Sequence, residues 1–209
     1  MLAHSIAYAP AHAMKISSFL ETTRDDYLIS HNISTYSLIA LTRELYPYMK
    51  INTNPSNSST ASSLSTNDVS ISNISTTSSS SPPSAITLRM ASNSIIALSY
   101  IGAQRASTGY RVMSTAKASL ESTVRSLAID LGKDNIRINT ISAGPIDTLA
   151  SRGIAGFTTM KEESIQKAPL KTSLIGADVG NLATFLASQE SSMITGQTIY
   201  VDGGFSSVL

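Results

Sequence analysis

The chain has 209 residues, of which 42% are apolar, with a formal net charge of +1 and no cysteine. This length suits one sizeable domain, and the apolar share is sufficient for a real core. The balanced charge gives no indication of nucleic-acid binding, and the lack of cysteine excludes disulfides, thiolate catalysis and cysteine metal sites.

Further exclusions come from the apolar runs and the histidines. No apolar run approaches the roughly 20 residues that a membrane span needs. The start, MLAHSIAYAP, has no basic residue before its apolar letters, so it does not read as a secretory signal or a transit peptide. His4, His12 and His31 lack metal-ligand spacing, and we expect no metal site. A soluble α/β protein is the class that remains.

The first third of the chain predicts a strand and a helix. Residues 1–9 read as a short strand. The pattern turns helical from 22 to about 49, where Thr23 suits the N-cap and Asp25 and Asp26 favour the first turn.

The composition then changes sharply. In residues 52–81, 23 of 30 residues are Ser, Thr or Asn, and Asp68 is the only charge. Such a stretch buries too little apolar surface to offset its ordering entropy, so we expect a disordered insert at about 52–84. A phosphorylated or glycosylated regulatory segment is the alternative.

Strands and helices alternate in the rest of the chain. The expected strands are 94–100, 136–142 and 197–204; the expected helices are 112–132 and a segment capped by Asp178 that runs to about Ser188. In the first of these helices, Leu120, Val124, Leu127 and Leu131 form one face. The alternation predicts a doubly wound parallel sheet of the α/β class.

A dinucleotide fold usually opens with a glycine-rich turn between a strand and a helix. The first glycine here is Gly102, and the later glycines do not form G-x-G-x-x-G. Either the fold is a different one or its first half is absent. About 170 ordered residues are too few for a complete sheet of this kind, which favours absence.

The segment YIGAQRASTGYRVMSTAK (100–117) carries the candidate chemistry. Lys117 follows Tyr110 by seven residues, Tyr100 precedes Tyr110 by ten, and position 113, four before the lysine, is Met. Seven helical residues advance about 700°, which brings Tyr110 and Lys117 to nearly the same helix face. A tyrosine hydroxyl is protonated at pH 7 and can donate to a developing oxyanion.

Four segments together resemble the NADH-dependent enoyl-[acyl-carrier-protein] reductases of the short-chain dehydrogenase type. They are HSIAYAP (4–10), 98–121, RINTISAGPIDTLASRGI (137–154) and ITGQTIYVDGGFS (194–206). Ketone-reducing members of that superfamily have Tyr-x3-Lys and a serine thirteen residues before the tyrosine, whereas position 97 here is Ala. Enoyl reductases have Tyr-x6-Lys, with another tyrosine ten residues earlier.

The resemblance implies a Rossmann-like fold that lacks its first β-α-β units. The family's glycine-rich turn and the acidic residue that selects the adenine ribose have no counterpart, and residues 1–9 match its fourth strand. The chain therefore resembles the carboxyl-terminal two-thirds of such an enzyme. We expect residues 1–209 to form a single incomplete reductase domain that is inactive on its own.

The resemblance also implies roles for individual residues. Tyr110 is the donor to the enolate oxygen, Lys117 binds the nicotinamide ribose, and Tyr100 lines the acyl pocket beside the thioester with a catalytic role. Ala9 touches the substrate. The cofactor-binding residues are Ile6, Lys117, Pro145, Ile146, Asp147, Thr148, Leu149 and Ala150. Residues 149–160 form a mobile flap over the acyl chain.

Plainer readings stand beside these roles. A tyrosine at a strand end is often a core residue, and AGPIDT (143–148) is also the sequence of an ordinary strand-to-helix turn. The four matching segments favour the functional reading in both cases.

The resulting expectation is an enzyme that reduces the C2=C3 double bond of enoyl thioesters on acyl carrier protein, the last reductive step of type II fatty acid elongation. NADH is the expected cofactor, with NADPH left open, and a homotetramer is the expected assembly. The location is the plastid stroma if the source is a plastid-bearing eukaryote, and the cytoplasm otherwise. The alternatives are a non-catalytic remnant and, third, a ketone-reducing short-chain dehydrogenase.

Overall fold

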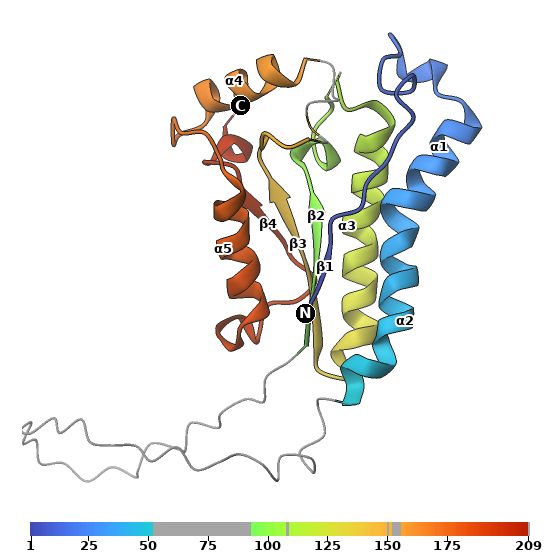
Figure 1. The fold of residues 1–209 in the computed structure, drawn as a ribbon, viewed down its shortest axis with the longest axis vertical. Helices are drawn as coiled ribbons and strands as arrows, with labels where there is room; N and C mark the ends of the chain where they lie inside the picture. Colours follow the sequence, from blue (N-terminus) through green and yellow to red (C-terminus); the bar gives the residue numbers. More distant parts are fainter. Residues whose placement is uncertain (52–92, 108, 150, 152–155, 209) are drawn as a thin grey trace, which may run out of the picture.

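A computed structural model describes residues 1–51, 93–107, 109–149, 151 and 156–208. Its centre is a parallel four-stranded sheet in the order β1-β2-β3-β4 (Figure 1). The strands are β1 (Leu2–His4), β2 (Asn93–Ser99), β3 (Ile136–Ala143) and β4 (Thr198–Val201). Within the described residues β2 and β3 are the inner strands, and their side chains are buried on both faces.

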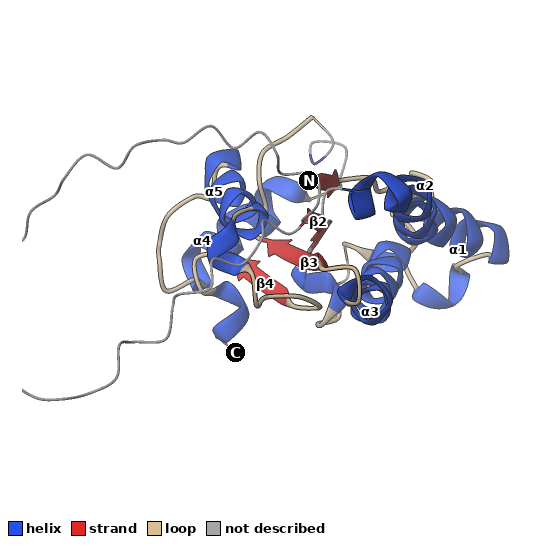
Figure 2. Ribbon diagram, turned by 90° about the horizontal axis from the view of Figure 1, so that it is seen from below, coloured by secondary structure: helices blue, strands red, loops and turns tan. Residues whose placement is uncertain are grey.

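Helices cover both faces of the sheet, as Figure 2 shows. On one face lie α1 (Arg24–His31), α2 (Ser37–Ile51) and α3 (Arg111–Gly132). On the other lies α5 (Gly176–Ala187), and α4 (Phe157–Lys167) lies near its start. Short 3-10 turns occupy Phe19–Glu21, Ile101–Ala103, Gln189–Ser191 and Phe205–Ser207. This layering confirms the doubly wound parallel sheet that the alternation of elements predicted.

The last crossover differs from the first two. The chain passes from β1 to β2 and from β2 to β3 through helices on the same face. It passes from β3 to β4 through α5 on the opposite face, while the strand order continues in one direction. This crossover therefore has the opposite hand to the other two, although parallel crossovers are nearly always right-handed.

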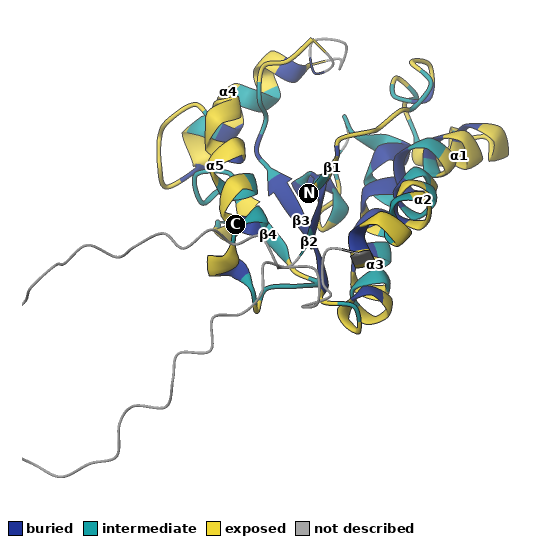
Figure 3. Ribbon diagram, turned by 60° about the horizontal axis from the view of Figure 1, so that its bottom comes forward, coloured by how far each residue is buried: buried dark blue, intermediate teal, exposed yellow. Residues whose placement is uncertain are grey.

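Two apolar cores hold the layers together, and Figure 3 shows the buried parts concentrated along the strands. Ile95 and Ile138 face α3, where they pack with Leu120 and Val124. Ile96 and Ile141, which lie one and three positions further along their strands and so point to the opposite face, pack with Val179 and Leu186 of α5. Full burial of each such side chain contributes about 1.5–3 kcal/mol to stability. Because successive side chains of a strand point to opposite faces, the apolar residues of β2 and β3 favour one helix layer on each face of the sheet.

The predicted helix over 22–49 is divided in the structure. A π-helical turn at Asn32–Tyr36 separates α1 from α2. Within this turn Ser34 bonds the backbone of Tyr8, and the Thr35 hydroxyl donates to the carbonyl oxygen of Ala116 at 2.8 Å. These tertiary bonds favour the wider turn, and π-turns are frequent at functional sites.

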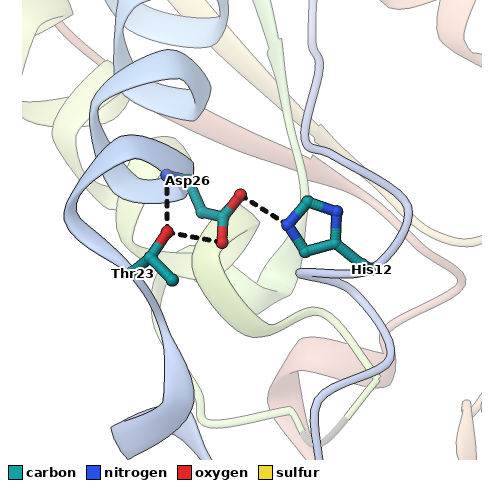
Figure 4. Close-up of polar contacts among 3 residues, drawn as sticks. All are labelled: His12, Thr23 and Asp26. Atoms are coloured by element: carbon teal, nitrogen blue, oxygen red, sulfur yellow. Dashed lines mark hydrogen bonds and ion pairs between the residues drawn. The ribbon is translucent and has the colours of Figure 1, made fainter.

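The start of α1 was predicted correctly, and its surroundings are shown in Figure 4. Thr23 is the N-cap, and its hydroxyl oxygen accepts from the Asp26 N–H at 3.1 Å. The Thr23 hydroxyl donates to the Asp26 carboxylate at 2.7 Å, and His12 forms an ion pair with the other carboxylate oxygen at 2.8 Å. The helix start is thereby tied to the preceding loop.

Three boundaries differ from the sequence predictions. The expected strand 1–9 is a strand only at Leu2–His4, and the expected strand 197–204 is a strand only at Thr198–Val201, because the glycine turn at 203–204 has positive φ values. Asp178 is not the cap of α5: it is the third helical residue, and its carboxylate accepts from the N–H of Ile175, which is the N-cap. The predicted insert, 52–84, lies outside the described residues.

Candidate active site

The carboxyl ends of the parallel strands lie at one edge of the sheet, where open α/β sheets bind ligands. Tyr100 directly follows β2, and the segment 144–149 follows β3. Residues 5–9 continue from β1, whose strand pairs with β2. Parallel pairing therefore gathers at one edge the segments that the sequence marked as functional.

Tyr100 and Tyr110 are in direct contact. Their ring centroids lie 4.9 Å apart, with the ring planes tilted by 59°. Gly102 makes this possible, since a Cβ atom there would lie 2.8 Å from Cδ1 of Tyr110 and 3.2 Å from Cδ1 of Tyr100. Any side chain at position 102 would displace at least one ring.

The hydroxyl groups of both tyrosines are protonated at neutral pH. Burial raises the pKa of Tyr100, and burial together with Tyr100 raises the pKa of Tyr110 well above its usual value. The Tyr100 hydroxyl donates to the sulfur of Met160 on α4 at 3.2 Å. The pair therefore offers hydrogen-bond donors beneath α4.

The turn that leads into α3 orients Tyr110. Tyr110 is the residue before the helix, and Arg111 has a φ of +43°, in the left-handed region that side chains disfavour. Such a conformation costs of the order of 1–3 kcal/mol and is common at functional sites. The Arg111 guanidinium donates to the carbonyl oxygen of Ser17 at 3.1 Å, which helps to hold the strained residue.

Lys117 lies on the buried face of α3. Its side chain is 5% exposed, and Nζ donates to the carbonyl oxygen of Leu98 at 2.7 Å. Burial lowers the pKa of Lys117 to about 8, while the charge of Glu121 acts in the opposite direction. The ammonium group is therefore mostly protonated at neutral pH. It lies beneath the end of β2, directly before Tyr100.

The segment after β1 is held by the π-helical turn. The Tyr8 N–H donates to the Ser34 hydroxyl oxygen at 2.9 Å, and the same hydroxyl lies 3.2 Å from the Tyr8 carbonyl oxygen. Ile6 is 41% exposed, and Ala9 is partly buried. One serine thus aligns the segment from Ile6 to Ala9 along the edge where the tyrosines lie.

The segment after β3 has its own internal bonds. Gly144 passes close to Asp202, and the half-buried Ile146 packs on the core beneath α5. The N–H of Thr148 donates to the Ser151 hydroxyl at 2.8 Å, and the N–H of Ser151 donates to the Thr148 hydroxyl at 3.1 Å.

The other predicted cofactor residues of this segment are less enclosed. Pro145 is half-buried, Asp147 is exposed, and Leu149 is 89% exposed. Ala150 lies outside the described residues, as do residues 152–155 of the expected flap. The end of that flap was wrongly predicted as loop, because residues 157–160 form the first turn of α4.

Two kinds of site are not found among the residues that the structure describes. No group of three or more His, Asp or Glu side chains is arranged to hold a metal ion. No helix in the described ranges has the length and hydropathy to cross a membrane.

Comparison with known proteins decides the family. The family model of enoyl-(acyl carrier protein) reductases matches residues 64–206 of the chain. The chain belongs to the enoyl-(acyl carrier protein) reductase family. Tyr100, Tyr110 and Lys117 all lie within the part of this family member that the family model covers.

Individual relatives agree with this assignment. The chain is 35% identical to the NADH enoyl-[acyl-carrier-protein] reductase FabI of Bacillus subtilis, over 98% of this chain and 63% of that protein. It is 37% identical to the NADPH enzyme FabI of Staphylococcus aureus, over 98% of this chain and 64% of that protein. The chain thus spans less than two thirds of the length of these curated relatives.

A solved structure shows the same fold. The enoyl-acyl carrier protein reductase of Bacillus cereus, crystallised with NADP+ and indole naphthyridinone, matches with a TM-score of 0.77 and 33% identity. The match covers 99% of this chain and 65% of that one.

Sequence reasoning did not find every polar group at the site of this enoyl reductase family member. Glu121 accepts hydrogen bonds from Ser99 and Gln104, and Met160 accepts one from Tyr100. One signal for Glu121 was available, because a carboxylate four residues after Lys117 lies on the same helix face. No local pattern indicated Met160, since its contact with Tyr100 depends on where α4 packs.

Proposed function

We propose that the protein reduces the C2=C3 double bond of enoyl thioesters carried on acyl carrier protein, the last reductive step of type II fatty acid elongation. NADH is the proposed cofactor, with NADPH as the alternative. The observation that carries the proposal is the contact between Tyr100 and Tyr110 at the carboxyl edge of the sheet, with the buried Lys117 on the helix that follows Tyr110, in a member of this family.

The chemistry requires a donor where charge develops. When bound, the reduced nicotinamide supplies a hydride to C3 of the substrate. Negative charge then develops on the thioester oxygen, and a preorganised hydrogen-bond donor stabilises it. We assign this donor role to Tyr110, because its raised pKa keeps the hydroxyl protonated. Uptake of a proton at C2 completes the reduction.

Lys117 supplies positive charge from the helix that follows this donor. Its pKa of about 8 leaves the ammonium group mostly protonated at neutral pH. We propose that Lys117 binds the nicotinamide ribose hydroxyls, because an ammonium group can donate hydrogen bonds to them and also stabilise nearby anionic charge.

The described residues fit the nicotinamide half of the cofactor. Ile6 and Ile146 offer apolar surface after β1 and β3, on the two sides of the end of β2. The remaining proposed cofactor contacts are Pro145, Asp147, Thr148, Leu149 and Ala150. Residues 1–101 contain no glycine, so they contain no glycine-rich phosphate turn. We therefore assign no residues to the adenosine half.

The substrate thioester is proposed to lie against Tyr100 and Tyr110, with Ala9 on the side of β1. The contact between Tyr100 and Met160 supports a position for the acyl chain beneath α4. We propose that the first turn of α4, which carries Met160, covers this chain.

Ketone reduction is less well supported. The position that would carry a catalytic serine, thirteen before Tyr110, is Ala97, which lies fully buried within β2. A methyl group there can donate no hydrogen bond to a ketone oxygen. The spacing of Tyr110 and Lys117 opposes this activity as well.

We propose a homotetramer that assembles through the long helices of one face. Apolar side chains on α1, the π-turn and α2 remain exposed, namely Tyr27, Leu28, Ile29, Tyr36, Leu41 and Tyr48. Leu28→Glu should dissociate the assembly in light scattering. Leu20→Glu, at a residue 95% exposed outside these helices, is the control. A monomeric wild type at micromolar concentration would contradict the proposal.

We place the activity in the plastid stroma if the chain comes from a plastid-bearing eukaryote, and in the cytoplasm otherwise.

A direct assay tests the activity. The 209-residue chain is assayed alone and as a fusion with the part of the Bacillus subtilis relative that has no counterpart in it. We expect NADH oxidation with a crotonyl thioester from the fusion and none from the chain alone. Tyr110→Phe should lower turnover of the fusion by at least about 100-fold, as for loss of one hydrogen-bond donor to a developing oxyanion.

The control for this assay is Tyr48→Phe, at a tyrosine 71% exposed on α2, which should leave turnover unchanged. A fusion that binds NADH but reduces no enoyl thioester would favour the non-catalytic reading. Reduction of an acetoacetyl thioester in its place would favour ketone reduction.

A further inference from the structure

A carboxylate is buried next to the candidate active site. Glu121 is 1% exposed and follows Lys117 by four residues on α3. One carboxylate oxygen accepts from the Ser99 hydroxyl at 2.7 Å, and the other accepts from the Gln104 amide nitrogen at 2.6 Å. Burial of a carboxylate is costly even with such bonds, so packing alone does not account for its position between helix and sheet.

The two donors lie on either side of the Tyr100 turn. Ser99 ends β2 immediately before Tyr100, and Gln104 follows the 3-10 turn Ile101–Ala103. Both ends of this turn are therefore attached to the same carboxylate. Gly102, which allows the rings of the two tyrosines to meet, lies between the two attachment points.

Lys117 holds the same stretch of backbone from the same helix. Its Nζ atom donates to the carbonyl oxygen of Leu98, the residue before Ser99. Lys117 and Glu121 thus act on consecutive residues, one through the carbonyl group and the other through the hydroxyl. Because the two are four residues apart on one helix face, their opposite charges also lie close together.

The titratable side chains that face this pair from β1 and β4, His4 and Tyr200, are uncharged near neutral pH, while Asp202 and Arg105 act on Tyr200. His4 faces Lys117 from β1, and its pKa of about 4 leaves the imidazole neutral. Tyr200 faces Glu121 from β4, and burial together with Glu121 and Asp202 raises its pKa. The negative charge of Glu121 opposes the effect of burial on Lys117. Glu121 is therefore the anion that acts on the buried ammonium group.

We propose that Glu121 is a positioning residue of the active site: it holds the Tyr100 turn through Ser99 and Gln104 and provides the counter-charge that keeps Lys117 cationic. The use of this turn and cation in catalysis rests on the proposed reductase function. The positioning itself rests on the contacts alone.

The test compares Glu121→Gln with Asp130→Asn, an exposed carboxylate on the same helix. Hydrogen exchange of the 209-residue chain reports on the turn, where the amides of Ala103 and Gln104 donate to the carbonyl oxygens of Tyr100 and Ile101. Glu121→Gln should speed their exchange by at least about tenfold, the equivalent of one lost hydrogen bond to a charged group. Asp130→Asn should leave it unchanged.

A second readout follows the charge. An NMR titration of the Lys117 side chain should show its pKa lowered by about one pH unit or more in Glu121→Gln, because a nearby opposite charge is removed. Ser99→Ala and Gln104→Ala each remove one donor and keep the charge. They should speed exchange of the turn but leave the pKa of Lys117 as in the wild type.

A folded Glu121→Gln variant with wild-type exchange and an unchanged pKa of Lys117 would overturn the proposal. If circular dichroism shows that this variant does not fold, Ser99→Ala and Gln104→Ala decide, and wild-type exchange in both would overturn it. In the active fusion, Glu121→Gln should lower kcat more than it raises KM. Absence of reductase activity alongside the expected exchange and pKa changes would refute the proposed function and leave the positioning role intact.

Discussion

The Nε2 atom of His4 lies 2.8 Å from the hydroxyl oxygen of Ser37 and joins the end of β1 to the start of α2. Ser37 donates its own hydrogen to the carbonyl oxygen of Ile33 at 2.5 Å, so it accepts from His4. His4 is 1% exposed, and burial, together with the charge of Lys117, lowers its pKa to about 4. The native protein therefore holds a neutral imidazole with its proton on Nε2.

Because His4 is neutral in the folded protein, we predict that acid lowers the stability of the fold. Between pH 6.5 and about 4 the unfolded chain binds a proton at His4 and the folded chain does not, so stability falls as pH falls through this window. The full effect is roughly 3 kcal/mol. His4→Gln, whose amide can still donate to Ser37, should lose less stability over this window. Urea unfolding at several pH values measures the difference.

His31→Gln is the control for this prediction, because it changes a more exposed histidine and keeps His4. Its loss of stability with acid should match that of the wild type. Equal acid sensitivity of His4→Gln and the wild type would contradict the assignment.

Gly102 predicts a steric effect on the tyrosine pair. In Gly102→Ala the new methyl group would lie 2.8 Å from the Tyr110 ring, which must move. Overpacking of this kind costs about 1–3 kcal/mol. Thermal unfolding should show the loss, and the near-ultraviolet circular dichroism of the tyrosines should change. Gly132→Ala is the matched control, because nothing lies within 4 Å of its new methyl group at the end of α3. Unchanged spectra in both variants would argue against the close packing at Gly102.

The N-cap of α1 predicts a difference between two small substitutions. Thr23→Ala removes the acceptor of the Asp26 N–H and the donor to the Asp26 carboxylate, and should cost about 1 kcal/mol. Thr23→Ser keeps the hydroxyl and should retain most of the stability. Chemical denaturation separates the two. Equal losses would show that the methyl group, and not the hydroxyl, stabilises the helix start.

We predict that the Ser34 hydroxyl stabilises the backbone of the segment after β1. Ser34→Ala leaves the Tyr8 N–H without its 2.9 Å partner, so exchange of that amide should accelerate severalfold. Ser30→Ala is the matched control, since the buried hydroxyl of Ser30 makes no hydrogen bond to any residue that the structure describes. It should be neutral or slightly stabilising. Slow exchange at Tyr8 in both variants would show that other contacts hold the segment.

Several features depended only on neighbours in the chain and were predicted. Tyr110 and Lys117 lie at the start and on the buried face of one helix, because their spacing of seven matches two helical turns. Thr23 caps α1 because its own side chain reaches a nearby N–H. The nearly continuous burial of β2 follows from its apolar run, which is typical of a strand that is covered on both faces.

Other features arose from contacts between distant segments. The π-turn at Asn32–Tyr36 forms where Thr35 bonds Ala116, 81 residues away. A glutamate is expected on the surface, yet Glu121 is buried, because Ser99 and Gln104 donate hydrogen bonds to its carboxylate. Met160 meets Tyr100 because α4 packs over the sheet edge.

Local sequence patterns were sufficient to predict the helix that carries Tyr110 and Lys117, the parallel α/β class and the ends of strands where a site would form. These follow from local periodicity and capping, whose hydrogen bonds close within a few residues. Two relationships became visible only in the folded chain: Tyr100 contacts Tyr110 across Gly102, and a buried carboxylate lies one helical turn after Lys117. Those relationships depend on the side chains that each surface meets after packing, and the burial energy that selects this packing is shared among residues far apart in the chain.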